Sequence, residues 1–392
     1  MNYALIQKTI GMMILVFAAI LIIPFSISLS YNDGNTSPFI YSFLIIFLFG
    51  SILFFPNRLN SFDSNIKIKE GFLIVVLFWV LLSFFGSFPF MFDTNLSMTF
   101  VDAFFESVSG WTTTGATVII NLDNLSPSIL IYRQLLQWLG GMGIVVLALA
   151  VLPMLGVGGM QLYKAESGGP IKDNKISPRI AETAQNLWKV YLGLTLSCAG
   201  AYYLAGMSLF DAIAHSFSTI AIGGFSTHSQ SIAYFDSAMI EIVCMIFMFL
   251  SALNFILHFH SLKSRSLKIY FKDVEFRLYF LLIIVSSIIL LVYSSFVHTN
   301  QISAMGILFQ VISFITTSGF VSTSYENWPV SIISILLFLS FLGACAGSTG
   351  GGMKIIRVLF IAKELKRGLI KIIHPSAEVP IKINNQAVNE NI

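Results

Sequence analysis

Three polar turns rich in threonine, serine and glycine recur in an otherwise apolar chain, and each follows a short amphipathic stretch. A shift of 109 residues places Asp102 and Gly115 of the first segment on Asp211 and Gly224 of the second. Glycine permits backbone shapes that a side chain would block, and converging backbone carbonyls replace the water shell of an alkali cation. The turns therefore predict a cation filter built from the carbonyls of Thr113, Thr114, Gly115, Ile222, Gly223, Gly224, Thr317, Ser318 and Gly319.

A glycine-rich run from Gly343 to Gly352 interrupts the last long apolar stretch. A regular helix is poorly supported by so many glycines, and irregular backbone at membrane depth is tolerated only where it faces protein or water. We therefore expect this run to line a cavity. A phosphate-binding loop is disfavoured, because the run continues as Met353-Lys354-Ile355 instead of Lys-Ser/Thr. Lys354 and Arg357 either contact the loop or the ion path, or serve only as cytoplasmic anchors.

Other reactive side chains give weaker signals. Arg133 lies near the outer end of its apolar stretch, where Glu106 or Asp123 could neutralise it, or where it could reach the interface unaided. His258 and His260 have no acidic partner nearby, so we expect no resident metal site there. No nucleophile and base stand out, which disfavours an enzyme. No carboxylate relay stands out either, so channel-like and proton-coupled transport both remain open.

The composition indicates whether this chain folds in water or in a membrane. Of its 392 residues, 56% are hydrophobic and 10% are charged, whereas roughly a quarter of a soluble domain is charged. Eight apolar stretches are long enough to cross a bilayer, at 9–30, 38–55, 71–92, 129–155, 187–206, 237–258, 276–298 and 330–362. We expect an all-α polytopic membrane protein with about eight spans and three re-entrant pore helices.

Basic residues predict the orientation. All 22 Lys and Arg except Arg133 fall on one set of alternate loops and in the tail, and none falls in the loops that hold the three turns. Because basic loops stay in the cytoplasm, we expect both termini there and the turns on the outer side.

The spans and turns predict five units along the chain. Each of three units would be a hairpin of one span, a half-helix too short to cross, a glycine turn and a second span. The units are a leading two-helix domain at 1–60, pore repeats at 61–165, 166–262 and 263–373, and a polar cytoplasmic tail at 374–392.

Five strings carry a resemblance to a known family, and they occur in the family's order along the whole chain. They are Thr112–Thr117, Gln137–Gly143, His215–His228, Thr316–Phe320 and Cys345–Lys354. In these strings the chain resembles the Trk/Ktr/HKT superfamily of potassium transporters, and within it the pore-forming subunit of the bacterial Trk system.

The resemblance implies potassium uptake across a bacterial inner membrane, with potassium as the transported ion and no covalently bound cofactor. Four linked hairpins would surround one pore, and the glycine turns would form a loose filter. An intramembrane gate would consist of Gly347, Ser348, Thr349, Gly350, Gly351, Gly352 and Lys354. The implied partners are a second copy of the subunit, a cytoplasmic nucleotide-binding ring and membrane lipid, with no nucleic acid.

One departure from the family concerns the number of repeats, because only three are found up to Ile392 and no apolar run follows residue 373. Unpaired filter groups facing lipid would be costly. We therefore expect that a separate polypeptide supplies the missing quarter, or that the chain is a truncated, non-conducting remnant. A secondary transporter with broken helices for another solute is a further alternative. It is disfavoured because such transporters often use inverted repeats, and these repeats share one orientation.

Overall fold

The computed structural model describes residues 1–57, 68–143, 180–296, 302–375, 380, 382–383 and 386–387. The second half of the expected span at 129–155, the boundary expected at 165/166 and most of the expected tail lie outside the described residues.

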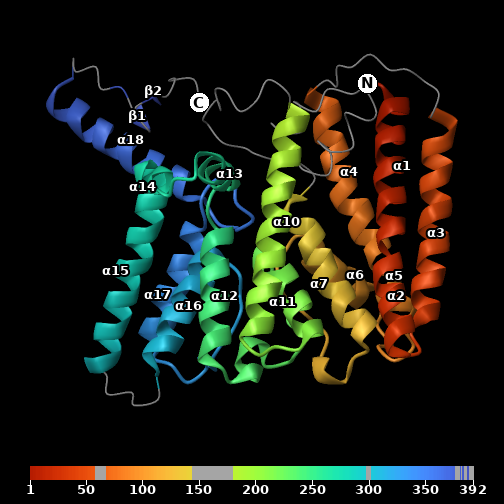
Figure 1. Cartoon of the computed structure of the whole chain (residues 1–392). Helices are drawn as coiled ribbons and strands as arrows, with labels where there is room; N and C mark the ends of the chain where they lie inside the picture. The colour runs from red at the N-terminus through yellow and green to blue at the C-terminus, as the bar shows by residue number, and fades with distance from the viewer. Residues whose placement is uncertain are drawn as a thin grey trace.

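The leading unit is an antiparallel helical pair at one edge of the molecule (Figure 1). It contains α1 (Tyr3–Ile20), α2 (Ile22–Tyr31), α3 (Thr36–Phe54) and η1 (Phe55–Asn57). Gly11 lets α1 and α3 approach closely, because a Cβ atom at this position would lie 2.7 Å from the backbone nitrogen of Phe54. Small residues at such contacts are how apolar helices pack tightly in a membrane.

The first hairpin follows and packs on the leading pair. It comprises α4 (Ile68–Gly86), α5 (Phe88–Phe92), α6 (Phe100–Trp111), η2 (Leu122–Asn124) and α7 (Pro127–Gly141). The second comprises α10 (Ile180–Leu204), α11 (Leu209–Ala221), η4 (Ser231–Phe235), α12 (Ala238–Ser251) and α13 (Phe255–Ser264).

The third hairpin comprises α14 (Lys268–Lys272), α15 (Val274–Phe296), α16 (Ala304–Thr316), α17 (Val330–Leu342) and α18 (Ile355–Ile373). An antiparallel pair of two-residue strands, β1 (Lys382–Ile383) and β2 (Gln386–Ala387), follows. Among the described residues, the expectation of an all-α chain holds apart from this pair.

The short helices α6, α11 and α16 each begin with a hydroxyl cap. Thr99 accepts a hydrogen bond from the backbone N–H of Asp102, Ser208 accepts one from Asp211, and Ser303 accepts one from Gly306. Such caps satisfy an otherwise unpaired N–H of the first turn. These helices have 12, 13 and 13 residues, which at 1.5 Å per residue is too short to cross a bilayer.

In the described part of the chain, four helical segments are long and apolar enough to cross a membrane. They are Tyr3–Tyr31, Thr36–Asn57, Lys69–Phe92 and Val274–Phe296. A fifth crossing is counted if the bent pair α12 and α13 forms one span. The shorter helix α17 covers part of the span expected at 330–362, and α10 covers the one expected at 187–206 except its last two residues.

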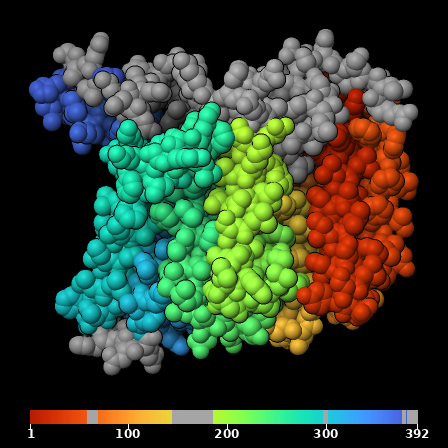
Figure 2. Space-filling model, in the orientation of Figure 1, coloured from red at the N-terminus to blue at the C-terminus, as the bar shows by residue number. Residues whose placement is uncertain are grey.

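The apolar stretch expected to cross at 237–258 is not one straight helix. The chain bends by 96° between α12 and α13, because the side chain of Asn254 caps a new helix by accepting a hydrogen bond from Ile256 N–H at 2.9 Å. Figure 2 shows the hairpins packed side by side into one body, from α3 at one edge to α15 at the other. The half-helices lie inside this body (Figure 1).

Candidate functional site

The three turns that follow the half-helices adopt one backbone shape. Thr113, Ile222 and Thr317 have left-handed φ values of 54°, 55° and 64°. The glycine two residues later is also left-handed in each turn, with φ values of 77°, 78° and 77° at Gly115, Gly224 and Gly319. In an ordinary helix stop, glycine occupies the first of these positions. Here β-branched residues occupy it, at a cost of about 1–2 kcal/mol each, and strain of this kind persists mainly at functional sites.

Each turn is fixed to the half-helix before it by the same hydrogen bond. The N–H groups of Thr114, Gly223 and Ser318 donate to the carbonyls of Ser109, Ser218 and Ser313, each at 2.9 Å. In a trans peptide the N–H and the preceding carbonyl point in opposite directions. The carbonyls of Thr113, Ile222 and Thr317 therefore all point away from the ends of their half-helices.

Neighbouring turns touch through their glycines. A Cβ atom on Gly115 would lie 2.1 Å from the carbonyl oxygen of Gly223, and one on Gly224 would lie 2.0 Å from that of Ser318. Only glycine leaves room for these contacts, so the first turn packs on the second and the second on the third. Beside Gly319 no described atom lies within 4 Å of the corresponding Cβ position. The three turns therefore form an arc with an open place at Gly319.

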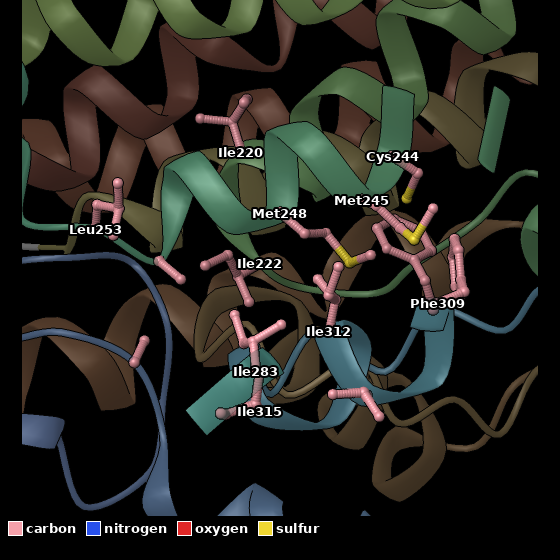
Figure 3. Close-up of a cluster of buried hydrophobic side chains, with 14 of the residues drawn as sticks. Ile220, Ile222, Cys244, Met245, Met248, Leu253, Ile283, Phe309, Ile312 and Ile315 are labelled. Carbon is pink, nitrogen blue, oxygen red and sulfur yellow. The ribbon is translucent and has the colours of Figure 1, made fainter. Parts of the chain in front are cut away.

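An apolar shell supports the second and third turns. In Figure 3, Ile222 lies with Met248 of α12, Ile312 of α16 and Ile283 of α15 in one cluster of buried side chains. The side chain of Ile222 is 1% exposed. Burial of a large aliphatic side chain contributes about 1.5–3 kcal/mol, enough to offset the strain of its left-handed backbone.

Arg133 lies behind the turns and is neutralised by Glu106. Its Nε lies 2.8 Å from Glu106 Oε1, and both side chains have no exposed surface. Its guanidinium also donates to Thr117 Oγ1 at 3.2 Å and to the carbonyl of Ser226 at 3.1 Å. The alternative in which Arg133 reaches the interface is therefore wrong, and the pair links the first hairpin to the second turn.

Asp123 instead binds His228, which follows the second turn. The distance is 2.7 Å from His228 Nδ1 to Asp123 Oδ1, and His228 Nε2 lies 3.5 Å from Asp211 Oδ1. Partial burial lowers the pKa of His228, but the hydrogen bonds and charges of Asp211 and Asp123 outweigh it, so the pKa lies above its usual 6.5. His228 also stacks on Tyr234, with ring centroids 3.4 Å apart.

The glycine-rich run forms an irregular loop between α17 and α18, as expected. The loop faces the bend between α12 and α13. Cys345 N–H donates to Ala252 carbonyl at 3.0 Å, and Phe255 N–H donates to Gly347 carbonyl at 3.0 Å. The two helix breaks thus satisfy each other's backbone groups, which is what makes broken helices tolerable at this depth. The break between α12 and α13 was not predicted from the sequence, although Asn254 inside an apolar run is a helix-start signal.

The loop also contacts the third turn and the end of the second half-helix. Gly351 N–H donates to Thr317 Oγ1 at 2.8 Å, and Thr349 Oγ1 donates to the carbonyl of Ile220 at 2.8 Å. Lys354 Nζ donates to the carbonyl of Gly350, so Lys354 contacts the loop and is more than a cytoplasmic anchor.

Glu275, which the sequence reading missed, holds both ends of the loop. Its Oε1 accepts hydrogen bonds from Ala346 N–H at 2.7 Å and from Ile356 N–H at 3.1 Å. In the sequence, Glu275 is a single carboxylate at the start of an expected span. A carboxylate that only faces water at the membrane interface would occupy the same kind of position. His258 is held by Tyr270 Oη at 2.7 Å and by the carbonyl of Leu250 at 2.9 Å.

A cavity of about 630 Å³ separates the turns from the loop. Thr113, Thr114 and Thr317 line it on one side. The loop lines it on the other, through all seven residues of the expected gate: Gly347, Ser348, Thr349, Gly350, Gly351, Gly352 and Lys354. The remaining expected filter residues do not line this cavity; they are Gly115, Ile222, Gly223, Gly224, Ser318 and Gly319. The structure therefore brings three of the expected filter residues and all of the expected gate residues to one cavity.

Comparison with known proteins identifies relatives over the whole chain. A family model described as TrkH, cation transport protein, matches residues 36–392. The Trk system potassium uptake protein TrkH of Escherichia coli strain K12 is 49% identical over 400 residues, covering 100% of this chain and 81% of that protein. The Trk system potassium uptake protein TrkG of the same organism is 38% identical over 393 residues, covering 97% of this chain and 79% of that protein.

A solved structure also matches. The crystal structure of the potassium transporter TrkH from Vibrio parahaemolyticus superposes with a TM-score of 0.85 at 46% identity, covering 98% of this chain and 79% of that one. With a family model over most of its length and a relative 49% identical across all of it, this chain belongs to the TrkH family of cation transport proteins.

Proposed function

We propose that this protein takes up potassium ions through a membrane pore, as the pore-forming subunit of a Trk-type system. The observation that carries the proposal is the strained turn that occurs three times, with its copies packed on one another beside a cavity that a glycine-rich loop also lines. Strain repeated at equivalent positions is unexplained by helix termination alone. Relatives of 38% to 49% identity are named potassium uptake proteins.

The filter residues act through their backbones, apart from Gly223, whose carbonyl accepts a hydrogen bond from Gln137 Nε2. The carbonyls of Thr113, Ile222 and Thr317 point away from their half-helices and replace water around a dehydrated potassium ion. Half-helix C-terminal ends carry partial negative charge, which favours a cation in the cavity below. The loop from Gly347 to Lys354 then obstructs the path on the cytoplasmic side until it moves.

The units we propose are three hairpins at 61–165, 166–262 and 263–373 after a leading pair at 1–60, and the order of the described helices supports them. In a bacterial inner membrane we place eight spans and three re-entrant helices, with both termini in the cytoplasm. Support comes from α14 and α18, which carry several basic residues and lie at the same end of the molecule as the N-terminus (Figure 1).

The partners we propose are a second copy of the subunit, a cytoplasmic nucleotide-binding ring and a further hairpin. The exposed basic helix α18 offers a docking place for the ring, with Lys363, Lys366 and Lys371. The further hairpin occupies the open place beside Gly319 and comes from a separate polypeptide or from more of the same protein.

The test is potassium uptake in a bacterium that lacks its own uptake systems. The chain is produced alone and together with the part of the Escherichia coli relative that the match leaves uncovered. Growth on low potassium and rubidium uptake should require the second segment. If neither combination takes up potassium while both proteins reach the membrane, the proposed function is wrong. Uptake by the chain alone would show that another copy fills the place beside Gly319.

A further inference from the structure

We propose that Gln137 of α7 is a positioning residue for ion selectivity, because its side-chain amide holds the second filter turn from behind. The inference rests on the proposed function. Gln137 Nε2 donates to the carbonyl of Gly223 at 2.6 Å, and Gln137 Oε1 accepts from the N–H of Phe225 at 3.0 Å. The side chain has no exposed surface.

One amide therefore orients both peptide units that flank Gly224. The N–H of Phe225 points at Gln137, and in a trans peptide the carbonyl of Gly224 must then point the opposite way, away from α7. The carbonyl of Gly223 points at Gln137 instead. Gln137 thereby decides which carbonyls of this turn are available to an ion.

The glycine at position 223 supports the same conclusion independently. Its φ lies outside the left-handed region, so its conformation does not demand glycine. The available space does demand glycine, because a Cβ atom at position 223 would lie 2.3 Å from Gln137 Cδ and 2.4 Å from Gln137 Oε1. The equivalent residues Thr114 and Ser318 carry side chains, and among the described residues no glutamine amide binds their carbonyls.

Gln137 belongs to a row of polar side chains on the face of α7 that meets the second hairpin. Arg133 donates to the carbonyl of Ser226 at 3.1 Å, and Gln134 accepts from the hydroxyl of Ser218. The row holds the end of α11 and its turn at three successive places. The first hairpin therefore sets the shape of the filter segment in the second.

The experiment compares Gln137→Met with Gln310→Met. Both wild-type side chains are fully buried glutamines on helices beside a turn. Gln310 has no hydrogen-bond partner among the described residues, which makes it the matched control. Methionine keeps the length of glutamine and removes both hydrogen bonds. Losing two buried hydrogen bonds leaves the turn free to relax, and we expect the ratio of potassium to sodium permeability to fall about tenfold.

The permeability ratio separates positioning from folding. A residue needed only for folding would lower potassium and sodium fluxes in proportion to protein amount and leave the ratio unchanged. We expect Gln137→Met to lower the ratio at equal protein in the membrane, and Gln310→Met to keep it. An unchanged ratio in Gln137→Met, or an equal fall in Gln310→Met, overturns the proposal.

A second measurement does not need transport. Purified protein should melt at a higher temperature in potassium chloride than in sodium chloride if the filter binds potassium, because a ligand stabilises the state that binds it. Gln137→Met should lose most of this difference and Gln310→Met should keep it. If the unmodified protein neither transports potassium nor is stabilised by it, the proposed function fails and this inference fails with it. If the unmodified protein transports potassium or is stabilised by it, but Gln137→Met and Gln310→Met behave alike, the proposed function stands and only this inference fails.

Discussion

The buried pair of Glu106 and Arg133 gives the sharpest prediction about stability. Replacing Arg133 by methionine leaves the Glu106 carboxylate in a site without solvent exposure, where its remaining partners are the hydroxyl of Thr117 at 2.9 Å and the N–H of Val118 at 3.2 Å. Breaking a buried ion pair from one side costs about 3–5 kcal/mol. We expect Arg133→Met to lose stability in this range, and Glu106→Gln to lose a comparable amount because it leaves the guanidinium uncompensated.

The double variant Glu106→Gln/Arg133→Met should be far milder than the sum of the two. No buried charge remains in it, and the loss consists chiefly of the hydrogen bonds from Arg133 to Ser226 and Thr117, at about 1 kcal/mol each. Since each single loss is about 3–5 kcal/mol and the double loss is about 2 kcal/mol, the cycle should show a coupling energy of at least about 4 kcal/mol. The assay is unfolding of the purified protein by stepwise transfer from mild detergent to sodium dodecyl sulfate, followed by circular dichroism.

The control pair lies on α18, where Arg367 Nη1 and Glu364 Oε2 are 3.7 Å apart and Glu364 is half exposed. Exposed pairs of this kind contribute about 0.2–1 kcal/mol, so Glu364→Gln should scarcely change the unfolding free energy. Additive effects of Glu106→Gln and Arg133→Met, or single losses no larger than that of the control, would refute the reasoning that this pair is charged and sealed from water.

Three further outcomes are expected. Gly224→Ala should abolish potassium uptake, because its Cβ atom would lie 2.0 Å from the Ser318 carbonyl oxygen. Gly319→Ala in the chain alone should lower stability only by the left-handed strain of about 1–2 kcal/mol. Equal losses of folded protein in the two variants on size-exclusion chromatography would show that the place beside Gly319 is filled. Glu275→Ala should raise potassium leak about tenfold by freeing both ends of the loop. Glu275→Gln, which keeps the acceptor oxygen, should leak less. Identical currents for the two variants would contradict the role of this oxygen in holding the loop. The raised pKa of His228 adds stability that is complete below pH 6.5 and is lost as the pH rises through the higher pKa of the folded protein. Melting curves should show this decline in stability, and His228→Gln should reduce it. An undiminished decline in the variant would assign the effect to another group.

Part of this protein could be predicted from its sequence alone. Apolar length is a property of local segments, and it predicted most of the helices. The orientation expected from the charge asymmetry stays a prediction. The three turns could be found because glycine beside threonine or serine repeats at a fixed spacing after short amphipathic stretches. The loop at Gly343 to Gly352 could be found because glycines weaken a helix wherever it lies.

The supports of the site could not be predicted in this way. Gln137 binds a carbonyl 86 residues away, and Glu275 binds an N–H 71 residues away. Neither side chain differs in the sequence from a glutamine or glutamate at an interface. The bend at Asn254 becomes tolerable only because a second broken helix pairs with the backbone groups it frees. Residue type and local spacing determine where the chain can turn, whereas partners brought together by packing determine which turns hold their strain and which carbonyls are free to meet an ion.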